Sequence, residues 1–124
     1  MKHVKQLTKN GCGQACIAMI AGVSFMTVVK KMNKTGKTTT RDIRKGLSYF
    51  KIKASEKRER ISKKTKLPKL CMVFIQSKDR KQKHWVVYRD GIFWDPAFNI
   101  KGITFDDADA TSFLEVKNNG PNNL

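Results

Sequence analysis

Residues 11–22 read GCGQACIAMIAG, a glycine-bounded run of small and apolar residues that favours a helix. Cys16, Met19 and Ile20 follow the three-and-four spacing of a stripe that packs into a core. A glycine ends the run where a helix C-terminal cap belongs. The run therefore predicts a core helix over residues 12–21.

Two more helices are expected directly after this one. Ser24 is suited to cap a helix that runs to about Met32. The run Thr38–Thr40 is suited to cap a third helix that ends near Phe50 and has apolar side chains on one side. The front part of the chain is therefore predicted to be helical.

The later part of the chain has the pattern of a sheet. Residues 70–76 (LCMVFIQ) form a continuous apolar run of strand length, typical of a central strand covered on both faces. An Asp-Gly pair at 90–91, between apolar runs, is a strong hairpin signal. Further strands are expected at 52–54, 84–88, 92–95 and 113–116. Because helices precede most of the strands, the predicted fold class is α+β with a small antiparallel sheet.

The length of 124 residues fits one domain, predicted over residues 1–117 and followed by a flexible tail over 118–124. No apolar run approaches the roughly 18 residues of a transmembrane segment, and the N-terminus lacks the pattern of a cleaved signal peptide. The three cysteines cannot all pair within the chain. We therefore expect free thiols in a reducing, cytoplasmic compartment, with export by an unrecognised route left open.

Positive charge is the strongest feature of the composition. The 26 Lys and Arg residues against 10 Asp and Glu give a net charge of +16, and 23 of the basic residues lie in 1–83. The stretch Lys51–Lys69 alone holds nine, and beyond the strand at 52–54 it predicts an exposed loop or helix. Such a field favours an acidic partner, an anionic membrane or nonspecific binding of nucleic acid. A surface that only keeps a small domain soluble explains the charge equally well.

Cys12 begins the predicted first helix, a position that favours a reactive thiol. Helix N-termini carry a positive dipole end and unpaired backbone N–H groups, which favour the thiolate. We expect Gly11 and Gly13 to leave the backbone around this thiol open to a substrate. Cys16 and Cys71 lie in apolar segments and are expected to be buried core thiols.

His84 and Asp95 lie on either side of the predicted hairpin. Counted from a turn centred near Asp90, they are at similar distances, so they are expected to be cross-strand neighbours. A carboxylate that holds one ring nitrogen leaves the other to face a thiol, as covalent catalysis by Cys12 requires. A surface histidine without a chemical role is the competing interpretation.

Gln6 precedes Cys12 by six residues. A side-chain amide beside a helix N-terminus can donate to an oxyanion together with a backbone N–H. Only this spacing gives weight to a glutamine in an otherwise basic segment.

The strings QLTKNGCGQACIAMIAG, HWVVY and FWDPA, in this order, resemble the papain-like cysteine peptidases. They are most similar to the bacterial branch that removes double-glycine leader peptides from bacteriocins. The resemblance implies a papain-like fold in which the first helix presents the nucleophile. It also implies a set of roles, with Cys12 as nucleophile, His84 as base, Asp95 as orienting carboxylate and Gln6 as oxyanion donor.

The sequence thus predicts a cysteine peptidase that cleaves an amide bond of a protein or peptide through a thioester on Cys12. A glutamine deamidase uses the same chemistry and stays open. A catalytically silent module that binds an acidic partner through Lys51–Lys69 stays open as well. No cofactor is expected, because no phosphate or dinucleotide fingerprint occurs. The cysteine spacings lack the CxxC pair typical of zinc sites, so no metal is expected either.

Overall fold

The computed structural model describes residues 1–76, 83–97 and 110–117. Within them, the helices come first, as α1 (Cys12–Ala21), α2 (Phe25–Met32) and α3 (Thr40–Ser48). The strands follow as β1 (Lys53–Ala54), β2 (Glu59–Arg60), β3 (Leu70–Gln76), β4 (Lys83–Arg89), β5 (Ile92–Trp94) and β6 (Ala110–Lys117). The tail predicted over 118–124 lies outside the described residues.

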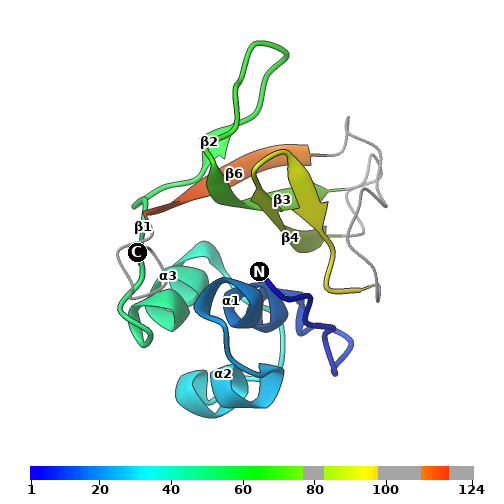
Figure 1. Cartoon of the computed structure of the whole chain (residues 1–124), viewed down its shortest axis with the longest axis vertical. Coiled ribbons are helices and arrows are strands. Elements are labelled where there is room, and N and C mark those ends of the chain that lie inside the picture. Colours follow the sequence, from blue (N-terminus) through cyan, green and yellow to red (C-terminus); the bar gives the residue numbers. More distant parts are fainter. Residues whose placement is uncertain (77–82, 98–109, 118–124) are drawn as a thin grey trace.

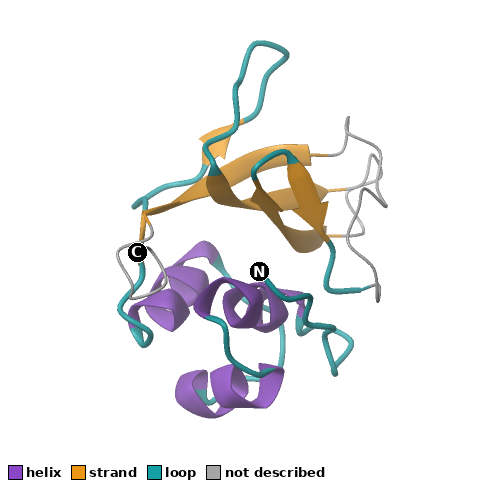
Figure 2. Cartoon of the chain, in the orientation of Figure 1, coloured by secondary structure: helices purple, strands orange, loops and turns teal. Residues whose placement is uncertain are grey.

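The helices form one layer and the sheet forms the other (Figures 1 and 2). All strand pairs in these residues are antiparallel, in the order β1-β6-β3-β4-β5, and β2 also pairs with β6. The predicted α+β class with a small antiparallel sheet is therefore confirmed. β3 lies in the middle of this order, as its continuous apolar run predicts.

Two strands differ from the sequence-based expectation. β6 extends over Ala110–Lys117, beyond the predicted 113–116, and lies between β1 and β3. β2 lies in the basic stretch, where the pattern favours a loop or a helix, and pairs with Ser112 and Phe113. Both residues of β2 are exposed, so the sequence has no alternation of apolar and polar residues that would indicate this strand.

Local capping sets the helix boundaries. Both α2 and α3 begin with a side-chain cap, as the sequence predicts. At α3, Thr39 and Asp42 form a reciprocal capping box. α3 ends at Ser48 rather than near Phe50, because the chain reverses at Lys51, whose φ of 61° is left-handed.

α1 is the central helix and contacts α2, α3 and β4. Residues 13–20 are all buried, so the helix is covered on every side rather than along one stripe. Met72, Val87 and Leu114 join it in one core cluster, and a second cluster around Cys71 packs apart from α1. No single helix in the described ranges is long and apolar enough to cross a membrane, although α1 and α2 pass that test as a pair bent by 110°.

Candidate active site

Cys12 is half-buried at the first position of α1, between two glycines. A Cβ on Gly11 would lie 2.7 Å from Cζ of Phe25, and one on Gly13 would lie 2.8 Å from Cδ1 of Ile43. The expectation that these glycines leave the backbone open is therefore wrong. They are buried, and they allow neighbouring side chains to pack directly against the backbone on both sides of the thiol.

His84 and Asp95 meet directly. Nε2 of His84 lies 2.6 Å from Oδ1 of Asp95, and the backbone N–H of Ala97 donates to the same oxygen at 2.9 Å. The Asp95 side chain is 3% exposed and the His84 side chain 24%. A short bond in this setting is the geometry of a charge-assisted pair. The carboxylate therefore fixes the orientation of the imidazole ring.

The route to this contact differs from the predicted one. The β4–β5 register pairs Val87 with Trp94, so one further step would place Asp95 opposite Val86 rather than His84. The turn is centred between Asp90 and its glycine, not on Asp90, and β5 ends before Asp95. The contact is therefore diagonal, from the residue just past β5 back to the start of β4.

The His84 imidazole also contacts Cys12. Burial by itself lowers the pKa of His84, but hydrogen bonds to Asp95 and Cys12 and the charges of both groups raise that pKa to about 9. Since Nε2 faces Asp95, Nδ1 is the ring nitrogen left for the thiol. The structure thus places a paired imidazole and carboxylate beside the Cys12 thiol.

The amino-acid sequence of residues 1–92 matches the family model of the Peptidase C39 family. The chain belongs to the Peptidase C39 family. Membership supports a cysteine peptidase function with protein or peptide substrates. The match includes Gln6, Cys12 and His84 and ends three residues before Asp95. A search of curated proteins found no match.

Gln6 lies near the site through its backbone. Its backbone N–H donates to the carbonyl of Pro96 at 2.8 Å, directly after Asp95. Its side-chain Nε2 donates to the carbonyls of Thr8 at 3.0 Å and Lys9 at 2.9 Å. Both amide protons are therefore already donated in this conformation, and the structure does not bring them to Cys12.

His3 is a site neighbour that the sequence analysis missed. Its Nε2 lies 2.8 Å from the backbone carbonyl of Asp95, and since a carbonyl only accepts, this nitrogen carries the proton. His3 and Gln6 together attach the N-terminal segment to the residues that follow β5. A lone histidine in a basic segment gives no sequence signal for a contact 92 residues away.

Gln14 was also missed, and it holds the loop between α2 and α3 against α1. Its side chain is fully buried in α1 and donates to the carbonyls of Lys34 and Gly36. Trp85, next to His84, donates its indole N–H to the carbonyl of Thr38 at 3.5 Å. The loop between α2 and α3 is thereby fixed beside the start of α1.

The other two cysteines of this C39 family member are buried away from the His84–Asp95 pair. Burial, together with the charges of Cys12 and Asp95, raises the pKa of Cys16 well above its ordinary value. Burial raises the pKa of Cys71 to about 12. Both thiols are therefore protonated at neutral pH, and their predicted burial in the core is confirmed.

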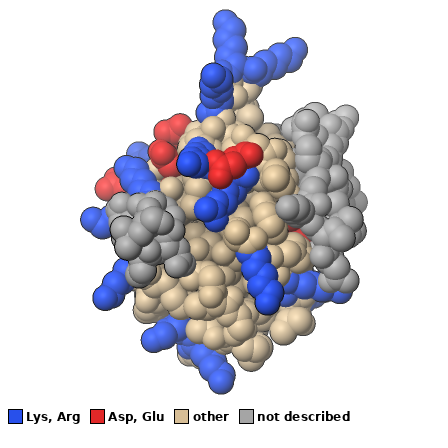
Figure 3. Space-filling model, in the orientation of Figure 1, with Lys and Arg blue, Asp and Glu red and all other residues tan. Residues whose placement is uncertain are grey.

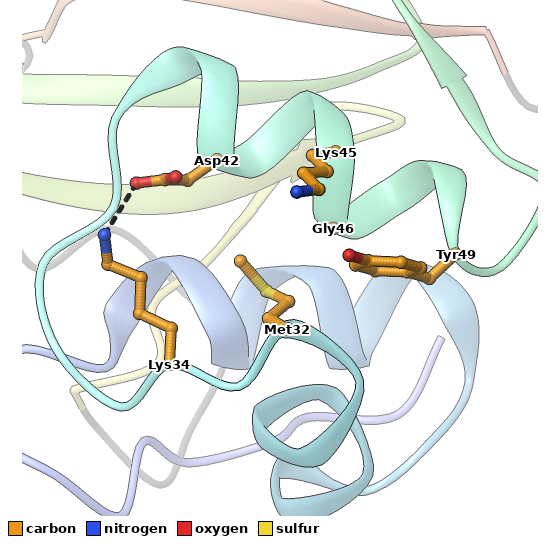
Figure 4. A pocket seen from close by; sticks show the side chains of 6 residues that line it. All are labelled: Met32, Lys34, Asp42, Lys45, Gly46 and Tyr49. Atoms are coloured by element: carbon orange, nitrogen blue, oxygen red, sulfur yellow. Dashed lines mark hydrogen bonds and ion pairs between the residues drawn. The ribbon is translucent and has the colours of Figure 1, made fainter.

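A small pocket lies elsewhere, between α2 and α3 (Figure 4). Its volume is about 70 Å³, and Asp42 closes one end through a 3.0 Å ion pair with Lys34. The backbone N–H of Thr39 and the Lys34 ammonium keep the pKa of Asp42 below its ordinary value. The pocket is too small for a peptide and contains none of the candidate site residues.

Across the described ranges, no group of three or more His, Cys, Asp or Glu side chains is arranged to hold a metal ion.

Proposed function

We propose that this chain is a peptidase whose nucleophile is Cys12, with His84 as the proton-transfer group and Asp95 as the residue that orients it. The observation that carries the proposal is the 2.6 Å contact between His84 and the buried Asp95, with the Cys12 thiol close enough to raise the pKa of His84. A structural role alone does not require a half-buried thiol at a helix N-terminus to face a buried imidazole–carboxylate pair.

The reaction follows from this order. The Cys12 thiolate forms a bond to the carbonyl carbon of the substrate, and the carbonyl electrons move to the oxygen. The unpaired backbone N–H groups at the start of α1 stabilise that oxyanion. His84 then gives its proton to the leaving amine, which breaks the C–N bond and leaves a thioester. Water, deprotonated by His84, hydrolyses the thioester and restores the thiol.

Gln6 is our candidate for a second oxyanion donor. The resemblance to the papain-like peptidases supports this role, and the backbone contact with Pro96 keeps the residue beside the site. The side chain needs to release the carbonyl of Thr8 or Lys9 before it can donate to an oxyanion. We therefore assign the role to the substrate-bound state.

Leader peptides that end in two glycines are the first substrate class to test. The strings around Cys12, His84 and Asp95 are most similar to the branch that processes such leaders. A deamidase cleaves the side-chain amide of glutamine through the same thioester, so the products distinguish the two activities.

Two measurements test the proposal. An activated acyl probe followed by mass spectrometry should label Cys12 and leave Cys16 and Cys71 free, and Cys71→Ala should label like the wild type. Proteomics on cells with wild-type or Cys12→Ala protein should then find new N-termini only with the wild type. Glutamines heavier by about 1 Da, the mass change of amide-to-acid conversion, would instead indicate a deamidase. Labelling of Cys16 in place of Cys12 would overturn the site.

For the basic stretch, we propose recruitment of an acidic protein partner or substrate. The loop between β2 and β3 projects from the sheet on the side away from the helices, and Lys or Arg side chains lie at its end (Figures 1 and 3). The loop contains the exposed residues Lys63, Lys64 and Lys66. Hydrogen bonds between Ser62 and Thr65 order the turn. The stretch has no interleaved aromatic residues for stacking on bases, which disfavours sequence-specific binding of nucleic acid.

A further inference from the structure

Arg58 differs from every other basic residue in the stretch 51–69, because it lies on a pair of aromatic rings. Its guanidinium carbon is 4.5 Å from the ring centre of Phe74 and 5.9 Å from that of Trp85. The two rings are 5.0 Å apart and belong to directly paired residues of β3 and β4. Phe74 and Trp85 therefore form a platform that holds the guanidinium by cation–π contacts.

The donors of Arg58 are available to a ligand. The residue is exposed, and within the described part of the chain its guanidinium has no carboxylate at ion-pair distance. Stacking covers one face of a guanidinium but leaves the N–H groups at its edge free to bind a carboxylate in a bidentate manner. A side chain held in place by rings also loses less conformational entropy on binding than a free lysine.

Trp85 links the platform to the segments that carry the candidate active site. Trp85 directly follows His84 in β4, and its backbone carbonyl accepts from the Cys16 thiol at 3.4 Å. Its indole donates to Thr38, whose side chain is in direct contact with the backbone of Gly13, next to Cys12. Trp85 thus lies between Arg58 and the two segments beside Cys12, namely α1 and the loop that contains Thr38.

We propose that Arg58, on its Phe74–Trp85 platform, is a subsite for a substrate carboxylate, so that the peptidase prefers an Asp or Glu side chain close to the bond it cleaves. This inference rests on the proposed function and names a substrate feature for the same site. A specific contact with a carboxylate distinguishes Arg58 from the lysines of the projecting loop. In our proposal those lysines attract acidic partners only by long-range electrostatic attraction.

The test uses a proteome-derived peptide library digested by the full-length protein. Wild-type cleavage sites should be enriched in Asp or Glu at one position within a few residues of the cleaved bond. For a peptide from that set and its Asn or Gln counterpart, kcat/KM should differ by about tenfold, as expected for a charge-assisted hydrogen bond. In Arg58→Gln this preference should disappear, because kcat/KM for the acidic peptide should fall to about the value for its amide counterpart.

Two further variants distinguish recognition from folding and from general charge. Arg58→Lys keeps the charge but loses the planar fork, so the acidic preference should fall several-fold without loss of folding. Lys57→Gln removes a neighbouring charge that has no aromatic platform and should keep the wild-type preference. Wild-type cleavage without acidic enrichment, or enrichment that persists in Arg58→Gln and Arg58→Lys, would overturn the inference alone. If the wild type cleaves no peptide and Cys12 resists the acyl probe, the proposed function fails and the subsite fails with it.

Discussion

The β4–β5 hairpin and the basic stretch 51–69 use charge in opposite ways. The hairpin region holds His84 against Asp95 at 2.6 Å, and Asp95 is 2% exposed. In the basic stretch, residues 56–60 are all exposed, and Figure 3 shows Lys or Arg side chains at the end of the projection and scattered over the rest of this face. Buried charges act on one partner at contact distance, whereas exposed charges act jointly through a salt-screened field. Chemistry should therefore depend on single residues of the hairpin region, and recruitment on the sum of many.

Replacement of His84 should have the largest effect on catalytic activity, and it tests whether chemistry depends on single residues of the hairpin region. His84→Ala removes the group that gives its proton to the leaving amine, so kcat/KM should fall by about 10²–10⁴-fold. The measurement is peptide cleavage by a variant whose circular dichroism spectrum matches that of the wild type. Full activity in the folded variant would contradict the proposed role of His84 in catalysis and would favour a binding module with the same fold.

Replacement of Asp95 should act through His84 and through pH. Because hydrogen bonds to Asp95 and Cys12 raise the pKa of His84 to about 9, wild-type kcat/KM should fall as pH rises through about 9. Asp95→Ala should slow turnover by about tenfold or more and move this alkaline limb to lower pH. Asp95→Asn, which keeps a hydrogen bond without the charge, should give an intermediate limb. A limb that stays in place in both variants would contradict the orienting role.

The same pKa makes a prediction for stability. Protonated His84 stabilises the folded state because its folded pKa lies above the ordinary value of 6.5. Its contribution is fully present below about pH 6.5 and is lost as pH rises through about 9. The free energy of unfolding, measured with denaturant, should therefore differ more between wild type and Asp95→Ala at pH 6 than at pH 10.

Local patterns predicted most of what positions the site. The cap before α2 and the Asp-Gly turn, with φ angles of 49° and 84°, are signals contained within a few residues. The spacing of His84 and Asp95 indicated that the two side chains meet, although the predicted register of their contact was wrong. The role of Cys12, His84 and Asp95 as a catalytic set stays a prediction.

Contacts between distant segments could not be predicted in this way. Gln14 reaches a loop 20 residues away, and β2 pairs with a strand more than 50 residues later. In the sequence, nothing distinguishes Arg58 from the other eight basic residues of the stretch 51–69. Only the fold shows that it lies on Phe74 and Trp85. Such residues make no periodic pattern, because their role is defined only by what tertiary packing brings beside them.

Removal of His3 should have a smaller effect than either change in the hairpin region. His3 is a positioning residue in our interpretation, since it holds the backbone carbonyl of Asp95. His3→Ala should lower kcat several-fold with little change in KM, and His3→Gln, whose amide can donate to the same carbonyl, should restore part of it. Lys2→Ala, at a neighbouring exposed position, is the matched control. Equal kcat in wild type and His3→Ala would show that the N-terminal contact has no part in positioning Asp95.

The projecting loop should have the smallest effect on chemistry and the clearest effect on recruitment. Gln in place of Lys63, Lys64 and Lys66 removes three exposed charges, while Ile61 and Leu67 still anchor the loop on the sheet. Binding to an acidic peptide should weaken several-fold at low salt, and the difference should shrink as salt is added, because exposed charges are screened. The rate of acyl-probe labelling at Cys12 should match that of the wild type, because the tip lies on the side of the sheet away from the helices (Figure 1). A folded variant with slower labelling would show that the loop contributes to the active site, and the separation between a chemical hairpin region and a recruiting basic stretch would be wrong.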